Sequence, residues 1–277
     1  MIKRFGFEGM KPAATPMDPT FKVSLADADI GEALNEVEKK RYMEIVGSLI
    51  YGAIHTRPDI ANAVGQLGRV MQKPAKKHMQ AAKRVLRYVA GTLDRGLHYE
   101  NKAWMAPGIK ELVPPSQVKG YADSDWAGDQ DTAKSTTGYL VFLAGGHISF
   151  RSVLQKIQAH SSAEAEYGSM SDCAREIQYI SNILQEVGLL KQTGPIQIYS
   201  DSSAAIAMTQ NKGVSHRTKH IAIRYHYVKT LIEEGVVSVH KISTEVNPAD
   251  ILTKATDVLT FARHADVCAP RIQLSDD

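Results

Sequence analysis

The sequence has little cysteine, no long apolar run and no strong excess of charge of one sign. Its 277 residues include only two cysteines, Cys173 and Cys268, which argues against a disulfide scaffold or a thiolate metal cage and fits a reducing compartment. No apolar stretch approaches the roughly 20 residues that span a bilayer. The basic N-terminus lacks the apolar stretch of a signal peptide. We therefore expect an intracellular protein with no membrane partner and no secretion.

What is present is the composition of an ordinary globular protein. Hydrophobic residues make up 43% and charged residues 23% of the chain, and the length is sufficient for a real core or two small domains. The formal net charge is only +3. A polyanionic partner would therefore require the positive charges to be concentrated on one face.

The first half of the chain has the pattern of a small helical module. Prolines interrupt residues 1–34, and apolar residues then recur at helical spacing in three stretches. Residues 96–99 are expected to form a short strand, and residues 100–117 are irregular. The expected inward residues are Tyr42, Ile45, Val46, Leu49, Ile50 and Ala53, then Ile60, Val64, Leu67 and Met71, and finally Met79, Ala82, Val85, Leu86 and Val89.

The third expected helix also carries a row of basic side chains, among them Lys76, Lys83, Arg84 and Arg87. On an arbitrary helix such a row is more often a solvated face. Alternatively, it tracks the phosphates of a nucleic acid without reading the sequence, because Lys and Arg release condensed counterions. The second half of the chain favours this phosphate-binding interpretation.

From residue 118 the pattern changes to strands alternating with helices. Ser161 and Glu164 fit a capping box at the start of a long helix, and Pro248 opens a last helix with Ile251, Leu252 and Leu259 inward. The order predicts an α/β fold, with one mixed five-stranded sheet and helices on both faces. Strands are expected at 118–123, 138–143, 147–153, 196–199 and 236–242, with a hairpin turn at Gly145-Gly146.

Four carboxylates fall where such a sheet would bring them together. Asp123 and Asp201 end strands, whereas Glu166 and Asp250 lie near helix starts. Clustered carboxylates repel one another unless cations neutralise them, and their oxygens suit Mg²⁺. Two such ions about 4 Å apart can activate a water and stabilise the leaving oxygen in phosphodiester cleavage.

Each of these acids alone has an ordinary structural explanation. Asp201 before two serines is typical of a helix cap, and an acid in a first helical turn favours the helix dipole. Spacing alone does not choose between Glu164 and Glu166, although the capping box occupies Glu164 and leaves Glu166 free to face the sheet edge. All four acids in this order of elements favour a metal site.

Ordered motifs extend along nearly the whole chain. They are Gly47–Tyr51, Thr56–Ile60, Ala82–Tyr88, Tyr121–Gly128, Lys134–Tyr139, Ser161–Tyr167, Ile198–Asp201, Arg217–Ile221, Ile223–His226 and Ala249–Lys254. Together they resemble the C-terminal part of the Pol polyproteins of copia-type retrotransposons. The resemblance implies a reverse transcriptase thumb or connection region followed by a ribonuclease H. In that family the ribonuclease H is a two-metal nuclease that cuts the RNA strand of an RNA–DNA hybrid during reverse transcription.

The resemblance also implies a ligand set, partners and boundaries. The catalytic and metal-binding residues carry over to Asp123, Glu166, Asp201 and Asp250, with two Mg²⁺ ions, or Mn²⁺, as cofactor. The implied partners are an RNA–DNA hybrid and the upstream reverse transcriptase segment. The expected regions are an extended segment at 1–34, a helical module at 35–105, a linker at 106–117, a ribonuclease H-like domain at 118–262 and a tail at 263–277. The expected nucleic-acid contacts are Lys76, Lys83, Arg84, Arg87, Lys134, Ser162, Arg217, Lys219 and Arg224.

Two departures from the family limit the function, and the order of the acids argues against one alternative. The family's polymerase motif, Tyr-x-Asp-Asp, is absent, so we expect no DNA synthesis from this chain alone. Residues 243–247 lack the loop histidine that many related nucleases use for product release. An integrase-type transposase usually orders its acids Asp, Asp, Glu, whereas Glu166 precedes Asp201 here. A folded but catalytically idle nucleic-acid-binding remnant stays as the alternative.

Overall fold

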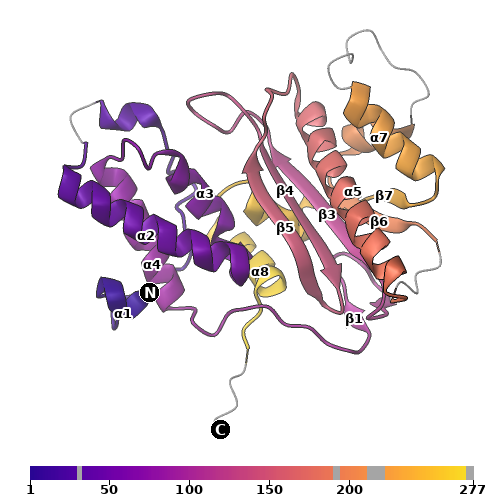
Figure 1. The fold of residues 1–277 in the computed structure, drawn as a ribbon, viewed down its shortest axis with the longest axis horizontal. Helices are drawn as coiled ribbons and strands as arrows, with labels where there is room; N and C mark the ends of the chain where they lie inside the picture. Colours follow the sequence, from indigo (N-terminus) through magenta and orange to yellow (C-terminus); the bar gives the residue numbers. More distant parts are fainter. Residues whose placement is uncertain (30–32, 190–193, 211–221, 273–277) are drawn as a thin grey trace.

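A helical module lies at one end of the molecule (Figure 1). In this computed structural model, which describes residues 1–29, 33–189, 194–210 and 222–272, the expected inward residues of its three helices are all buried or partly buried in one core. Asn35 begins the first long helix because its side chain accepts from Glu38 N at 2.9 Å. The elements are α1 (Ile2–Phe5), η1 (Leu25–Ala28), α2 (Glu36–His55), η2 (Pro58–Ile60), α3 (Ala61–Arg69) and α4 (Lys76–Ala90).

The expected mixed five-stranded sheet is confirmed. Its strand order is β5-β4-β3-β6-β7. Strand β4 is antiparallel to both of its neighbours, β5 and β3, whereas β6 and β7 run parallel to β3. A separate two-stranded hairpin, β1 (Trp104–Met105) with β2 (Leu112–Val113), precedes it. The five strands are β3 (Lys119–Asp125), β4 (Thr136–Leu143), β5 (Gly146–Leu154), β6 (Ile196–Ser200) and β7 (Val237–Lys241).

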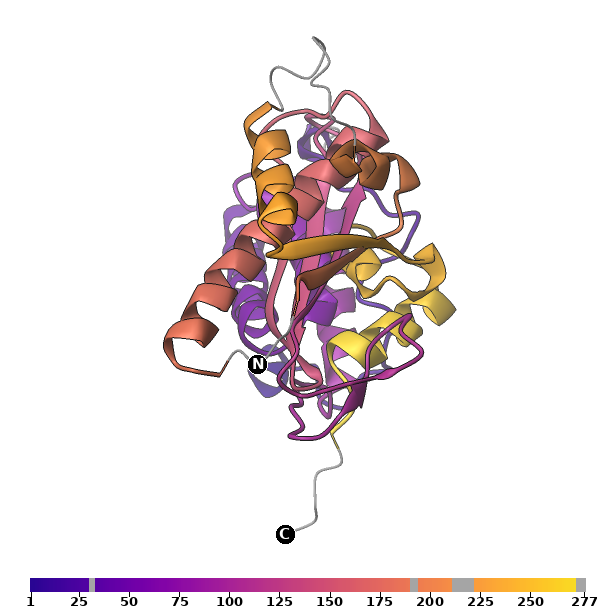
Figure 2. The ribbon, with the colours of Figure 1, turned by 90° about the vertical axis from the view of Figure 1, so that its right-hand side faces the viewer.

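Helices cover both faces of this sheet, as expected (Figure 2). One face packs on α5 (Ser162–Glu186), α6 (Ser203–Gln210) and α7 (Ala222–Glu233). The other packs on α8 (Val258–Cys268), on the 3-10 helix η5 (Pro248–Leu252) and on the helical module, in one continuous apolar core. Gly120 lets α5 approach β3 closely, because a Cβ there would lie 2.7 Å from Ile177 Cδ1. Among the helices in the described ranges, none is long and apolar enough to cross a membrane.

Three local expectations were wrong. Residues 96–99 form no strand in the described part of the chain. The hairpin turns at Ala144-Gly145, where both residues have positive φ (53° and 78°), rather than one position later. The last helix is two elements, because the Asp257 side chain accepts from Leu259 N and Thr260 N and starts α8 afresh. This new start leaves Leu259 79% exposed instead of inward.

Candidate active site

Strand β3 carries Asp123 into the interface between the sheet and η5. Asp123 pairs in register with Gly138 of β4. A Cβ at Gly138 would lie 2.9 Å from Ala249 O and 2.6 Å from Thr253 Cγ2, so only glycine lets η5 sit this close. As a result Asp123 is 2% exposed, and its Oδ2 lies 2.5 Å from Thr253 Oγ1.

Glu166 and Asp201 join Asp123 at this end of the sheet. Glu166 lies in the first turns of α5, and Asp201 directly follows β6. Each of the three carboxylates offers an oxygen, and these oxygens lie within 4.8 Å of one another. Three of the four predicted carboxylates are therefore brought together. We call this set the acidic triad.

The carboxylates of the acidic triad repel one another. Burial, together with the neighbouring carboxylates, raises the pKa of both Asp123 and Glu166 above the ordinary range. Glu166 Oε2 is buried without a hydrogen-bond partner. Three clustered carboxylates, one with an unpartnered oxygen, form the kind of oxygen ligand set that Mg²⁺ or Mn²⁺ prefers. The residues therefore fit a divalent cation.

Asp250, the fourth predicted ligand, pairs instead with a lysine. It lies in η5, 3% exposed, and its Oδ1 is 2.5 Å from Lys254 Nζ. It contributes to raising the pKa of Asp123, so it lies within electrostatic reach of the triad. Burial alone would lower the pKa of Lys254, but Asp123 and Asp250 outweigh it and raise that pKa.

Short contacts from β7 and the turn after it hold Asp201. Thr244 Oγ1 donates to Asp201 Oδ2 at 2.6 Å, and Lys241 Nζ donates to the Asp201 main-chain oxygen. Ser243 to Asn247 contains no histidine, and Thr244 is the residue of that turn that touches the triad. His240 of β7 bonds to Ser238 Oγ and packs on Tyr199, so its contacts are those of a structural histidine.

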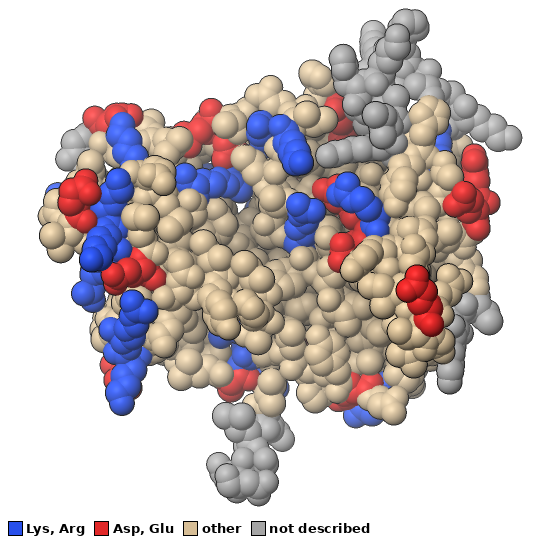
Figure 3. Space-filling view, viewed as in Figure 1, with Lys and Arg blue, Asp and Glu red and all other residues tan. Residues whose placement is uncertain are grey.

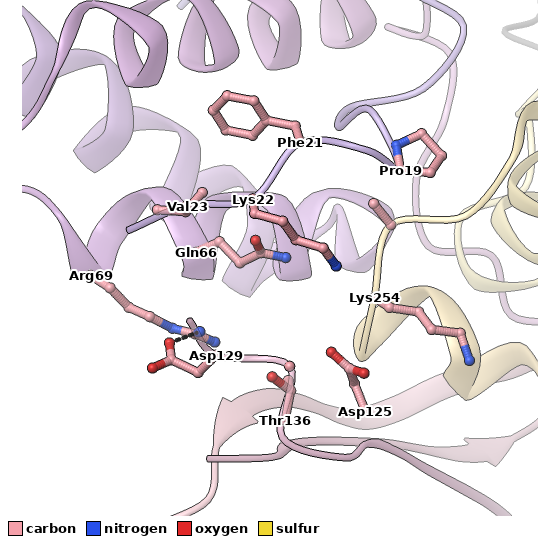
Figure 4. A pocket seen from close by; sticks show the side chains of 12 residues that line it. Pro19, Phe21, Lys22, Val23, Gln66, Arg69, Asp125, Asp129, Thr136 and Lys254 are labelled. Atoms are coloured by element: carbon pink, nitrogen blue, oxygen red, sulfur yellow. Dashed lines mark hydrogen bonds and ion pairs between the residues drawn. The ribbon is translucent and has the colours of Figure 1, made fainter. Parts of the chain in front are cut away.

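A small pocket between the N-terminal half of the chain and the end of β3 is lined by Lys22, Arg69, Asp125 and Lys254 (Figure 4). Asp125, the last residue of β3, lies between Lys22 and Lys254 in this view, and both lysines lower its pKa against the larger, opposite effect of burial. Arg69 of α3 pairs with Asp129 at 2.8 Å. The N-terminal half thus supplies positive charge beside Asp125 and Asp129.

Glu164 and Glu166 have different roles, as the capping prediction indicated. Ser161 Oγ accepts from Glu164 N at 3.2 Å, and Glu164 Oε2 accepts from His160 N at 2.8 Å. Glu164 therefore serves the helix start, with its partner one residue earlier than in a standard capping box. Only Glu166 belongs to the triad.

The predicted nucleic-acid residues have different surroundings. Lys76, Lys83 and Ser162 are exposed, and Lys134 is half-buried. Arg84 bonds to Thr15 and Arg87 to the Lys11 carbonyl, so these two arginines hold the N-terminal segment. Figure 3 shows Lys and Arg interleaved with Asp and Glu over the module rather than in one uniform patch. Arg217 and Lys219 lie outside the described residues, as does the side chain of Arg224.

Sequence reasoning gave no role to Thr253, Lys254, Thr244 or Lys241. Two of them had a visible signal, because Thr253 and Lys254 stand in the same motif as Asp250. The four-residue spacing of Asp250 and Lys254 is typical of an ion pair on one helical turn. Thr244 and Lys241 come from a different strand and turn, and no local pattern indicates them.

Comparison with known proteins decides the family. The chain is 39% identical over 256 residues to the retrovirus-related Pol polyprotein from transposon TNT 1-94 of Nicotiana tabacum, covering 92% of this chain and 18% of that protein. It is 39% identical over 265 residues to that from transposon RE1 of Arabidopsis thaliana, covering 96% and 17%. The chain belongs to the Pol polyproteins of copia-type retrotransposons.

This Pol fragment spans less than a fifth of the length of these relatives. No family model matches it. Among solved structures it is similar to LC11-RNase H1 in complex with an RNA/DNA hybrid, at 15% identity and a TM-score of 0.38, over 50% of this chain and 94% of that one.

Proposed function

We propose that this Pol fragment is a ribonuclease H that hydrolyses the RNA strand of an RNA–DNA hybrid during reverse transcription. The family relationship supports a retroelement role, and the acidic triad supports phosphodiester chemistry. Its partners would be the hybrid and the upstream reverse transcriptase segment of the polyprotein. Its place of action would be a cytoplasmic particle or the nucleus.

The proposed roles follow from the contacts of each acid. Asp123, Glu166 and Asp201 would hold a divalent cation, with Asp250 as a further acid beside them. When bound, Mg²⁺ supplies an activated water and stabilisation of the leaving oxygen. Thr253 and Thr244 orient Asp123 and Asp201 by hydrogen bonds of 2.5 and 2.6 Å. Fixed ligands cost little reorganisation when the reaction occurs.

One observation carries this proposal. Glu166 belongs to the triad, and its Oε2 is buried without a hydrogen-bond partner among the described residues, although buried polar atoms normally have partners. A divalent cation held by the triad would account for both the unpartnered oxygen and the clustering.

A cleavage assay tests the proposal. The purified chain is incubated with a hybrid labelled on the RNA strand, a second labelled on the DNA strand, and duplex RNA and duplex DNA as controls, with Mg²⁺, Mn²⁺ or EDTA. We expect cleavage only of RNA within the hybrid, and only with a cation. Hybrid binding without cleavage would favour the idle remnant. Primer extension on the same hybrid is expected to be absent.

A further inference from the structure

Lys254 puts a permanent positive charge inside the acidic cluster. Its Nζ lies 2.5 Å from Asp250 Oδ1, and the Asp250 side chain is only 4% exposed. The same ammonium is attracted to Asp123 and Asp125. The chain therefore supplies a cation of its own beside Asp250, and the other three carboxylates form the acidic triad.

The geometry divides the cluster into two halves. Asp123, Glu166 and Asp201 bring their oxygens within 4.8 Å of one another, and Asp250 is not part of that group among the described residues. Glu166 Oε2 and Asp250 Oδ1 are both buried without an aligned hydrogen bond among the described residues. The Lys254 ammonium nevertheless lies 2.5 Å from Asp250 Oδ1 as a counter-charge, and Glu166 Oε2 has no such ion pair in the described part of the chain. The first half lacks a counter-charge and the second half does not.

We propose that Lys254 is a positioning residue that stands in for a second divalent cation. The chain then binds one ion tightly at the acidic triad, and a second ion only weakly, by displacing the ammonium from Asp250. This inference rests on the proposed function and specifies how its metal site is filled.

Displacement is physically accessible to this side chain. The Lys254 side chain is 42% exposed and lines the pocket between the module and β3 (Figure 4). Its long, flexible stem lets the ammonium move into water without unfolding η5. The cost of displacement is the loss of a short ion pair to a buried carboxylate, which lowers the affinity for the second ion.

Calorimetric titration of the full chain with Mn²⁺ alone tests the inference without measuring activity. In the unaltered chain we expect one ion with a Kd at least about tenfold lower than that of any second ion. In Lys254→Gln, whose amide still donates to Asp250, we expect the second ion to bind at least about tenfold more tightly. Lys254→Arg keeps the charge and should behave like the unaltered chain.

Lys22→Gln is the matched control. Lys22 is exposed and lines the same pocket, so its loss removes the same charge without breaking the Asp250 pair. We expect its second-ion affinity to change less than about threefold. An equal gain in Lys22→Gln would overturn the inference, since any nearby charge would then suffice.

Two further outcomes separate this inference from the proposed function. Two ions of equal affinity in the unaltered chain would overturn the role of Lys254, whatever the folding of its variants, and would leave the nuclease proposal intact. Tight binding that survives in Asp201→Asn would instead contradict the acidic triad as the metal site. That result would remove the basis of both proposals.

Discussion

Two buried aspartates, one in each half of the molecule, have opposite surroundings. Asp59 in the helical module is 1% exposed and Asp123 in the sheet is 2% exposed. Arg57 contacts both Asp59 oxygens, at 2.9 and 2.8 Å, and Tyr88 donates to Oδ2 at 2.6 Å. The Arg57 guanidinium is itself satisfied by Thr92. The chain therefore neutralises Asp59 completely.

Among the described residues Asp123 accepts one side-chain hydrogen bond, from the Thr253 hydroxyl at 2.5 Å, and it faces further acids. The Lys254 ammonium attracts it, but forms its ion pair with Asp250. The same degree of burial thus belongs to a carboxylate paired with a cationic side chain in one half and to a carboxylate clustered with other acids in the other. Burial alone does not distinguish them. The distinction lies in whether the protein itself provides the balancing charge.

The largest expected effect tests the neutralised side of this comparison. Asp59→Asn leaves the Arg57 guanidinium, 7% exposed, without its partner, and we expect the free energy of unfolding to fall by about 3–5 kcal/mol. Urea unfolding measures it. The matched change Asp123→Asn, in EDTA, should be neutral or stabilising because it relieves repulsion. Equal destabilisation by both changes would break the comparison.

The second prediction tests the clustered acids. Asp201→Asn keeps the size of the side chain but removes a charge from the triad, so hybrid cleavage should fall by on the order of 10²-fold or more. Hybrid affinity should persist, because it depends mainly on Lys and Arg. Rates and affinities are measured on the same preparation. Asn caps helices as well as Asp does, so near-normal cleavage would reduce Asp201 to a cap.

A pH series in EDTA gives the third prediction. Because the pKa values of Asp123 and Glu166 are raised, the folded state holds protons that the unfolded state releases above about pH 4. Stability from these groups therefore falls as pH rises toward their folded pKa values. We expect the stabilisation by Mg²⁺ to grow from about pH 5 to about pH 8, by a few degrees in Tm.

At each pH the difference in Tm with and without Mg²⁺ removes the contributions of groups far from the site. One of these is His78, whose pKa is lowered by burial and whose own contribution has the opposite sign. Asp201→Asn should flatten the Mg²⁺ effect across the series. A constant Mg²⁺ effect at every pH in the unaltered chain would mean that the cation binds elsewhere.

The smallest expected effect concerns the module's surface. Lys76 and Lys83 are exposed, and replacing both with Gln should reduce the salt slope of hybrid binding by roughly two units, with no change in sequence preference. Fluorescence anisotropy at several salt concentrations measures the slope. Arg84→Gln is expected to loosen the N-terminal segment instead, since Arg84 bonds to Thr15. An unchanged slope would make Lys76 and Lys83 a solvated face.

The sequence predicted the helices, the sheet and the inward residues, because periodicity is a local property. The motif around Asp123 and the helix start at Ser161 were equally local, and three of the four acids meet as expected. Contacts between distant segments were not predictable in this way. Thr15 and Arg84 are 69 residues apart, and no period indicates that the arginine would serve the fold.

The fourth acid shows the same limit. The position of Asp250 near a helix start suggested a metal ligand, and its pairing with Lys254, four residues later, is local. Its separation from the oxygens of the triad depends instead on how η5 packs against β4. That packing depends on Gly138, a residue more than 100 positions earlier in the chain. Leu259 was misplaced for a related reason, because the Asp257 cap resets the helical phase.

The continuous core between the two halves has a practical consequence for dissecting this polyprotein. Asn62 of α3 donates to the Leu252 carbonyl at 3.2 Å, and Leu140 and Phe142 of β4 lie in the same apolar cluster as Leu49 and Leu86. A second half excised at residue 118 would present this surface to water and lose a support of η5, which bears Asp250. We expect such an excised fragment to aggregate, and the smallest well-behaved recombinant unit to begin before α2.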